Sequence, residues 1–222
     1  MDIKCAVILI TSASSIFGRA LALHYARLGA RLILCDQDET SLRQITLQCQ
    51  TINPDVHYYP MLSTSAQEVD ALFDYIERTY QQTPDVLINH WPNAPFPSFL
   101  SEHASTQFFD QWNRLTANFF SFGYTCAERM RSSGVKGVIV NVISYNETLE
   151  MAGIESAASM VAGFTHSWAK ELTPFNIRVG GVIPQLVTEP EFSHGMMQCD
   201  ELTRHTEYIV ANEYFSGRVV SA

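Results

Sequence analysis

The side chains that could move a proton in this chain gather after one apolar run, at Ser144 and Tyr145. The run itself, 137–143, has the composition of a buried strand, and the segment 155–172 after it has the pattern of a helix. A serine hydroxyl could hydrogen-bond a carbonyl, and a phenol could act as an acid or a base. No lysine accompanies the phenol to support proton transfer. The pattern therefore indicates carbonyl chemistry without a complete acid–base pair.

A second group of residues could bind a phosphate. The segment 11–18 reads TSASSIFG, follows the apolar run 3–10 and leads into a helical pattern over 15–28. Free N–H groups at such a helix start attract anions. Asp36 comes 18 residues after Gly18, at the end of the next predicted strand, where a carboxylate binds an adenosine ribose and repels a 2′-phosphate. The chemistry indicated is NAD binding; the alternative is an ordinary strand–helix turn that binds nothing.

The elements that must position these residues alternate along the chain. Continuous apolar runs of this kind are typical of strands covered by helices on both faces of a parallel sheet. We predict strands at 3–10, 31–35, 56–59, 85–89, 137–143, 177–183 and 217–220. We predict helices at 15–28, 39–50, 66–81, 106–132 and 155–172. The pattern predicts one α/β domain, residues 1–222, with a doubly wound, Rossmann-like parallel sheet of about seven strands and helices on both faces.

Composition excludes several classes of function. The net charge of −9 disfavours nucleic acid and anionic membranes as partners. There is no apolar stretch long enough for a membrane span and no basic region before the first apolar run, so we expect neither a span nor a secretory signal. The five cysteines show no C-x-x-C or Cys/His ligand spacing, which indicates reduced thiols, no metal site and a cytoplasmic protein.

The segment 11–18 resembles the T-G-x-x-x-G-x-G turn of the short-chain dehydrogenase/reductase family, and the resemblance covers nearly the whole chain. Ser12 and Ile16 replace the first two glycines, and only Gly18, which permits close helix–strand packing, is kept. The Ser12 hydroxyl could bond a phosphate, whereas Ile16 puts a branched side chain where the backbone should approach the pyrophosphate. The positions that the resemblance assigns to a cofactor are Ser12, Ser14, Ser15, Ile16, Gly18, Asp36, Asn89 and Thr188.

Other family motifs are partly kept. The family's N-N-A-G after strand four reads NHWP here, so only Asn89 matches, and we expect the bulky Trp91 and rigid Pro92 to crowd the adenosine side of the cleft at that bend. His90 admits two interpretations, a catalytic residue or a loop residue with a local partner. The run 184–188 (PQLVT) resembles the family's P-G-x-x-x-T, with Thr188 one residue early. The lid that usually covers the substrate is expected to be short, with 192–197 as its remnant.

The resemblance also implies catalytic positions. Ser144 aligns with the family's catalytic serine, and Asn118 with the asparagine that bends the fourth helix and holds a water of the proton relay. The alternatives are structural: Ser144 ends a strand, and Asn118 satisfies a backbone carbonyl at a helix irregularity. The register of the matching run 163–172 places the family's Tyr and Lys at Ile154 and Ala158, which cannot transfer a proton. Tyr145 is the one phenol near the site.

The predicted fourth helix carries more aromatic residues than one buried stripe needs. These residues are Phe108, Phe109, Trp112, Phe119, Phe120, Phe122 and Tyr124. In the family, the fourth and fifth helices of two subunits form a four-helix interface. The resemblance therefore implies a homodimer or homotetramer through these helices, or pairing with an active relative. A thick core within one domain is the alternative.

Three functions remain open from the sequence. The first is a catalytically inactive family member that acts as a structural or regulatory subunit, with weak or no NAD binding. The second is a divergent NAD-dependent oxidoreductase that acts on an alcohol or ketone through Ser144, Asn118 and Tyr145. The third is a binding protein for another small molecule in the same cleft.

Overall fold

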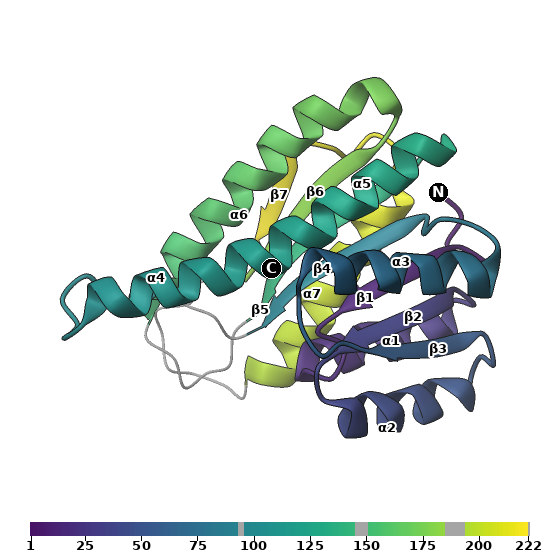
Figure 1. The fold of residues 1–222 in the computed structure, drawn as a ribbon, viewed down its shortest axis with the longest axis horizontal. Helices are drawn as coiled ribbons and strands as arrows, with labels where there is room; N and C mark the ends of the chain where they lie inside the picture. Colours follow the sequence, from purple (N-terminus) through teal and green to yellow (C-terminus); the bar gives the residue numbers. More distant parts are fainter. Residues whose placement is uncertain (93–95, 145–150, 185–193, 222) are drawn as a thin grey trace.

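The computed structural model describes residues 1–92, 96–144, 151–184 and 194–221, without the side chains of 114–117, 151–153 and 194–198. Its centre is a seven-stranded parallel sheet in the order β3-β2-β1-β4-β5-β6-β7 (Figure 1). The strands are β1 Val7–Thr11, β2 Arg31–Asp36, β3 Val56–Pro60, β4 Val86–Pro92, β5 Val138–Ser144, β6 Arg178–Ile183 and β7 Arg218–Ser221. The predicted Rossmann-like sheet is confirmed, and its strand order reverses between β1 and β4, where α/β proteins bind ligands.

Helices cover both faces of this sheet. The helices are α1 Ile16–Arg27, α2 Glu39–Gln50, α3 Ala66–Tyr80, α4 Ala104–Leu115, α5 Ser121–Ser133, α6 Met151–Leu172 and α7 His194–Ala211. One core packs α1, α2 and α7 against the sheet, with Tyr25, Leu42 and Ile209 buried there. The opposite core packs α3, α5 and α6 against the other face, with Phe73, Met130 and Ala169 buried there. Figure 1 shows α4 continuing past the carboxyl ends of β4 and β5.

The structure differs from the predicted elements at several places. The helix predicted over 106–132 is interrupted by a π-helical turn, Thr116–Phe120. The first strand begins at Val7, because residues 4–5 form a turn in which Cys5 has a φ of 68°. The fifth predicted helix, 155–172, begins earlier, at Met151. An 18-residue helix, α7, lies where only a short lid remnant was expected.

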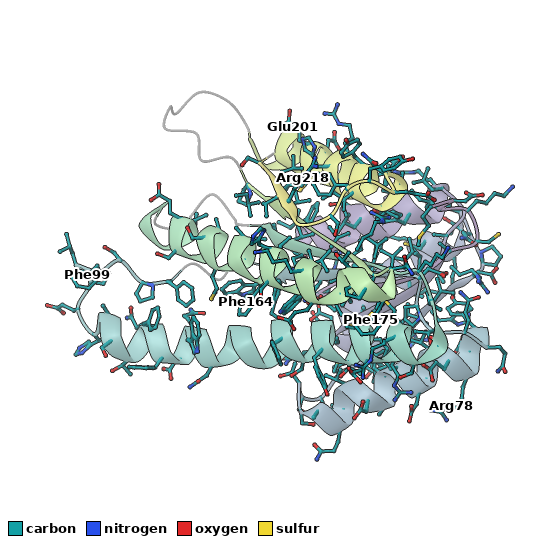
Figure 2. All side chains as sticks on the ribbon, turned by 90° about the horizontal axis from the view of Figure 1, so that it is seen from above. Arg78, Phe99, Phe164, Phe175, Glu201 and Arg218 are labelled. Atoms are coloured by element: carbon teal, nitrogen blue, oxygen red, sulfur yellow. The ribbon has the colours of Figure 1, made fainter. Side chains whose placement is uncertain are left out.

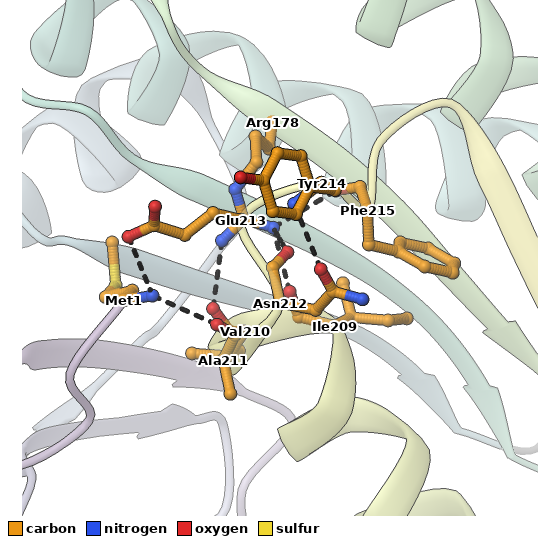
Figure 3. A network of polar contacts seen from close by, with 9 residues as sticks. All are labelled: Met1, Arg178, Ile209, Val210, Ala211, Asn212, Glu213, Tyr214 and Phe215. Carbon is orange, nitrogen blue, oxygen red and sulfur yellow. Dashed lines mark hydrogen bonds and ion pairs between the residues drawn. The ribbon is translucent and has the colours of Figure 1, made fainter.

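The end of α7 is held by two cationic groups (Figure 3). The Arg178 guanidinium donates to the carbonyls of Ile209, Val210, Asn212 and Phe215, over 2.8–3.1 Å. The amino group of Met1 donates to the Ala211 carbonyl at 3.1 Å. The last carbonyls of a helix lack partners within the helix and carry partial negative charge, so cations stabilise this end. The chain's first residue and β6 are thereby fixed to α7.

Candidate functional site

The first turn has a glycine-like backbone at Ser12, one of the two positions where a glycine of the family motif is replaced. Ser12 has a φ of 50°, in the left-handed region that favours glycine. The Ser15 hydroxyl donates to the Ser12 carbonyl at 2.8 Å and accepts from the Gly18 N–H at 3.0 Å. Ser15 is therefore the N-cap of α1. One of the N–H groups at the helix start is thus satisfied by a side chain of the turn itself.

Gly18 and Ile16 occupy opposite environments in this turn. A Cβ atom on Gly18 would lie 2.3 Å from the Ser12 carbonyl oxygen, so only glycine allows α1 to approach β1 this closely. Ile16 is the first residue of α1 and 70% of its surface is exposed. Its apolar side chain stands in solvent at the helix start, where an anion would approach.

Asp36 is hydrogen-bonded to the first turn. Its Oδ2 accepts from the Ser14 N–H at 3.0 Å and from the Ser14 hydroxyl at 2.5 Å. Its Oδ1 accepts from the Gln37 N–H at 2.7 Å. A carboxylate offers about four acceptor positions, so three of them are already used. A ribose bound here would have to displace or share the Ser14 hydroxyl.

A cavity of about 240 Å³ lies at the carboxyl ends of β1, β2 and β4. It extends from Asp36 and Met61 to Trp91 and Asn118. Its remaining lining residues are Thr11, Ser12, Cys35, Gln37, Thr64, Asn89, His90, Pro92, Gln111, Phe119 and Phe122. Ligand sites in proteins span roughly 300–1,000 Å³, so this cavity is small for a dinucleotide.

Trp91 and Pro92 line this cavity, but not from a bend. The prediction that the chain bends after Asn89 was wrong, because β4 continues to Pro92 and pairs with β5 as far as Ser144. Trp91 packs edge-on against Phe96 at 6.0 Å between ring centroids. The whole motif, 89–92, lies within β4.

Asn89 and Asn118 have different surroundings. Asn89 is buried, and its side-chain N–H group donates to the Phe119 carbonyl at 2.8 Å and to Asn141 Oδ1 at 3.4 Å. Asn141 in turn donates to the Thr165 hydroxyl at 3.1 Å. A π-helical turn leaves a carbonyl without its usual partner, and here Asn89 supplies that partner. Asn118 lies in the same turn, with its side chain exposed beside the cavity.

His90 and Ser144 form a buried contact that the sequence analysis missed. His90 Nε2 lies 2.7 Å from Ser144 Oγ. Burial lowers the pKa of His90 to about 3, and the nearby Ser12 carbonyl offsets this only in part. That carbonyl lies outside hydrogen-bonding geometry, so His90 Nδ1 has no hydrogen bond to the described residues. The signal available in the sequence was that each residue directly follows a predicted strand, 85–89 or 137–143.

The positions predicted to lack catalytic groups lie on α6. Ile154 is buried, and Ala158 is partly buried one helical turn further on. Neither side chain carries a group that can hold a proton. Tyr145 and Thr188 lie outside the described residues, so their predicted roles stay predictions.

Among the described residues, no group of three or more His, Cys, Asp or Glu side chains is placed to hold a metal ion. Burial and the neighbouring Asp36 raise the pKa of the Cys35 thiol. None of the described helices has the length and apolar character needed to cross a membrane.

Comparison with known proteins places these features in a family. The sequence profile described as short chain dehydrogenase matches residues 6–196. The 7alpha-hydroxysteroid dehydrogenase of Escherichia coli K12 is 24% identical over 215 residues, which is 92% of this chain and 82% of that protein.

Solved structures share the fold. A short-chain type dehydrogenase/reductase from Mycobacterium marinum superimposes with a TM-score of 0.83 at 20% identity, over 99% of this chain and 94% of that one. An NAD⁺-bound xylitol dehydrogenase superimposes with a TM-score of 0.81 at 18% identity, over 100% of this chain and 98% of that one.

Proposed function

The chain belongs to the short chain dehydrogenase family, and we propose that it is a catalytically impaired member that acts as a structural or regulatory oligomeric subunit. The observation that carries this proposal is the pair Ile154 and Ala158 on α6, where the family resemblance expects the acid–base groups. Hydride transfer to a carbonyl also needs a proton, and without a group to supply it the reaction is slow. We propose that the whole chain, 1–222, acts as one domain in the cytoplasm.

The dinucleotide site supports the same proposal. Ser15 caps the start of α1, and the Ser14 hydroxyl donates a hydrogen bond to the Asp36 carboxylate. Ile16 exposes its apolar side chain at the helix start, where a phosphate would bind. Each feature competes with a cofactor contact rather than making one. The carboxylate still favours NAD over NADP, because it would repel a 2′-phosphate. We therefore expect weak NAD binding or none.

The proposed partner is a second copy of this chain. Exposed aromatic side chains on α4, on α5 and on the π-helical turn between them give an apolar surface, which we call the α4–α5 face: Phe108, Phe109, Trp112, Phe120 and Tyr124. Figure 2 shows α4 and α5 lying end to end, with α6 running alongside them. Phe120 stacks on Tyr124 at 6.1 Å and meets Trp168 of α6 at 6.0 Å. Apolar patches of this kind mark association sites, and the chain's net charge of −9 disfavours nucleic acid and anionic membranes as partners.

A test of impaired activity uses the purified chain with NAD or NADH and a broad panel of alcohols and ketones. We expect no turnover above that of the buffer. NAD-dependent turnover that Ser144→Ala abolishes would overturn the proposal and establish an oxidoreductase.

Cofactor binding is measured separately, by melting the protein with NAD and NADH at millimolar concentration. A ligand that binds only the native state raises the melting temperature. We expect little or no rise for the wild type. The rise should be larger for Ser14→Ala, because removing the Ser14 hydroxyl frees an acceptor position on the Asp36 carboxylate.

One observation favours the second candidate, a divergent NAD-dependent oxidoreductase. Asp36, His90 and the exposed Asn118 line one cavity, and His90 contacts Ser144. Ser144 would bind a substrate carbonyl, and Tyr145 would be the proton donor. This candidate requires both the rise in melting temperature and the turnover described above.

A further inference from the structure

His90 and Ser144 make a contact that the missing acid–base pair does not explain. The two side chains come from neighbouring parallel strands, in which His90 pairs with Val142 and Pro92 with Ser144. Side chains two residues apart point to the same face of a sheet, so His90 and Ser144 are diagonal neighbours. Their 2.7 Å separation lies within the roughly 2.6–3.2 Å that joins a nucleophile to its base.

The backbone and ring of His90 are held in place from several directions. Thr11 Oγ1 accepts from the His90 N–H at 2.8 Å and donates to the His90 carbonyl at 3.3 Å. Phe17 meets the imidazole edge-on, with ring centroids 5.1 Å apart. With the ring held against Phe17, its Nε2 lies at Ser144 Oγ. A base oriented by its surroundings is the second requirement for activating a hydroxyl.

The surroundings of the ring also decide which atom carries the proton. The imidazole is uncharged at neutral pH, because burial lowers the pKa of His90 to about 3. Nδ1 faces the Ser12 carbonyl side without a hydrogen bond, and a carbonyl nearby favours N–H over a lone pair at that atom. Nε2 is then an acceptor, and the Ser144 hydroxyl donates to it. The Ser144 proton therefore points toward His90, and the lone pairs of the Ser144 oxygen point away from it.

We propose that Ser144 is a nucleophile with His90 as its general base, and that the pair accepts an acyl group from a small activated ester. Ser144 Oγ would attack the ester carbonyl carbon while its proton passes to His90 Nε2. The bond from that carbon to the alkoxy or phenoxy leaving group would break, and the imidazolium would return its proton to that group. Water then attacks the acyl carbon, its proton passes to His90, and Ser144 leaves with that proton.

The surroundings of the pair set the rate and the substrate size. A buried imidazole is a weak base, and proton removal by a weak base is slow. We therefore expect acylation by activated esters and no rapid turnover. The adjoining cavity of about 240 Å³, lined by His90 and Pro92, favours a short acyl group. The reaction needs no dinucleotide, so it lies outside the proposed function, and its failure leaves that function untouched.

The test incubates the whole chain with p-nitrophenyl acetate, without NAD, followed by acid quenching, intact-mass measurement and peptide mapping. We expect one acetyl group on Ser144. Ser144→Ala should lose it, and His90→Gln, which keeps a polar group without a usable base, should acquire it at least about tenfold more slowly. His166→Gln, an exposed position on α6, is the matched control and should behave like the wild type.

Three results would overturn the proposal: no acetyl group on the folded wild-type protein, an acetyl group only on other residues, or equal rates in His90→Gln and the wild type. If His90→Gln does not fold, the wild-type map still decides. A second measurement then uses phenylmethanesulfonyl fluoride, which should label Ser144 with loss of fluoride and block later acetylation.

Discussion

The side-chain amide of Asn89 donates to the main-chain carbonyl of Phe119 across 2.8 Å, and so joins the middle of β4 to the π-helical turn Thr116–Phe120. Both groups are buried. Asn89, which was predicted to border a cofactor, thus donates a hydrogen bond that supports the π-helical turn. Asn118, which was the candidate for satisfying a carbonyl in this turn, lies exposed beside the cavity instead.

Asn89→Ala should destabilise the protein, because the Phe119 carbonyl would be left buried without a donor. A buried unsatisfied group costs about 1–3 kcal/mol, which urea unfolding would measure as a lower midpoint. Gln44→Ala, at an exposed position of α2, is the control and should change the midpoint little. Equal midpoints for Asn89→Ala and the wild type would show that the turn satisfies its carbonyl otherwise.

Gly18→Ala should destabilise the protein, because the new Cβ would lie 2.3 Å from the Ser12 carbonyl oxygen. Forcing an extra methyl group into a packed site costs typically about 1–3 kcal/mol. Gly163→Ala is the matched control, because a Cβ there meets nothing within 4 Å in the middle of α6. Removing a helical glycine should stabilise the protein by about 0.5–1 kcal/mol. The melting temperature should thus fall for Gly18→Ala and rise for Gly163→Ala.

His90 should make the protein less stable as the pH falls. Its pKa is about 3 in the folded protein and about 6.5 in an unfolded chain. Below about pH 6.5 the unfolded chain therefore binds a proton that the native protein does not, and stability falls by up to about 1.4 kcal/mol per pH unit until the pH nears the folded value.

Urea unfolding at several pH values would measure how the free energy of unfolding changes with pH. In His90→Gln, this free energy should depend less steeply on pH by the same amount per pH unit. The other histidines are present in both proteins, so the difference isolates His90. An NMR titration that placed the His90 pKa near 6.5 in the native state would contradict the burial argument.

Phe120→Glu should break the proposed association through the α4–α5 face. Phe120 is 47% exposed and stacks on Tyr124, and a carboxylate there would be desolvated in an apolar interface. Light scattering after size exclusion should show a monomer, with circular dichroism unchanged. Tyr214→Ser, at an exposed aromatic residue after α7, is the control and should keep the oligomer. A monomeric wild type would refute the interface.

The sequence by itself determined the sheet and most of its helices. Apolar runs such as 137–143 have no polar face, so they fit only a strand covered on both sides. Gly18 was also readable, because a glycine at a strand–helix turn indicates close packing. The replacements at Ile154 and Ala158 were visible without coordinates, since the register of the following helix fixes them.

Only the tertiary structure decided what the polar residues near the cavity contact. Asn89 and Phe119 are thirty positions apart, and His90 and Ser144 are fifty-four positions apart. Their hydrogen bonds depend on which strands and helices are neighbours and in what register. Short-range sequence patterns report which residues are buried, but a hydrogen bond needs two groups within about 3 Å. Folding brings these pairs to that distance, and the identities of the partners follow from the strand order.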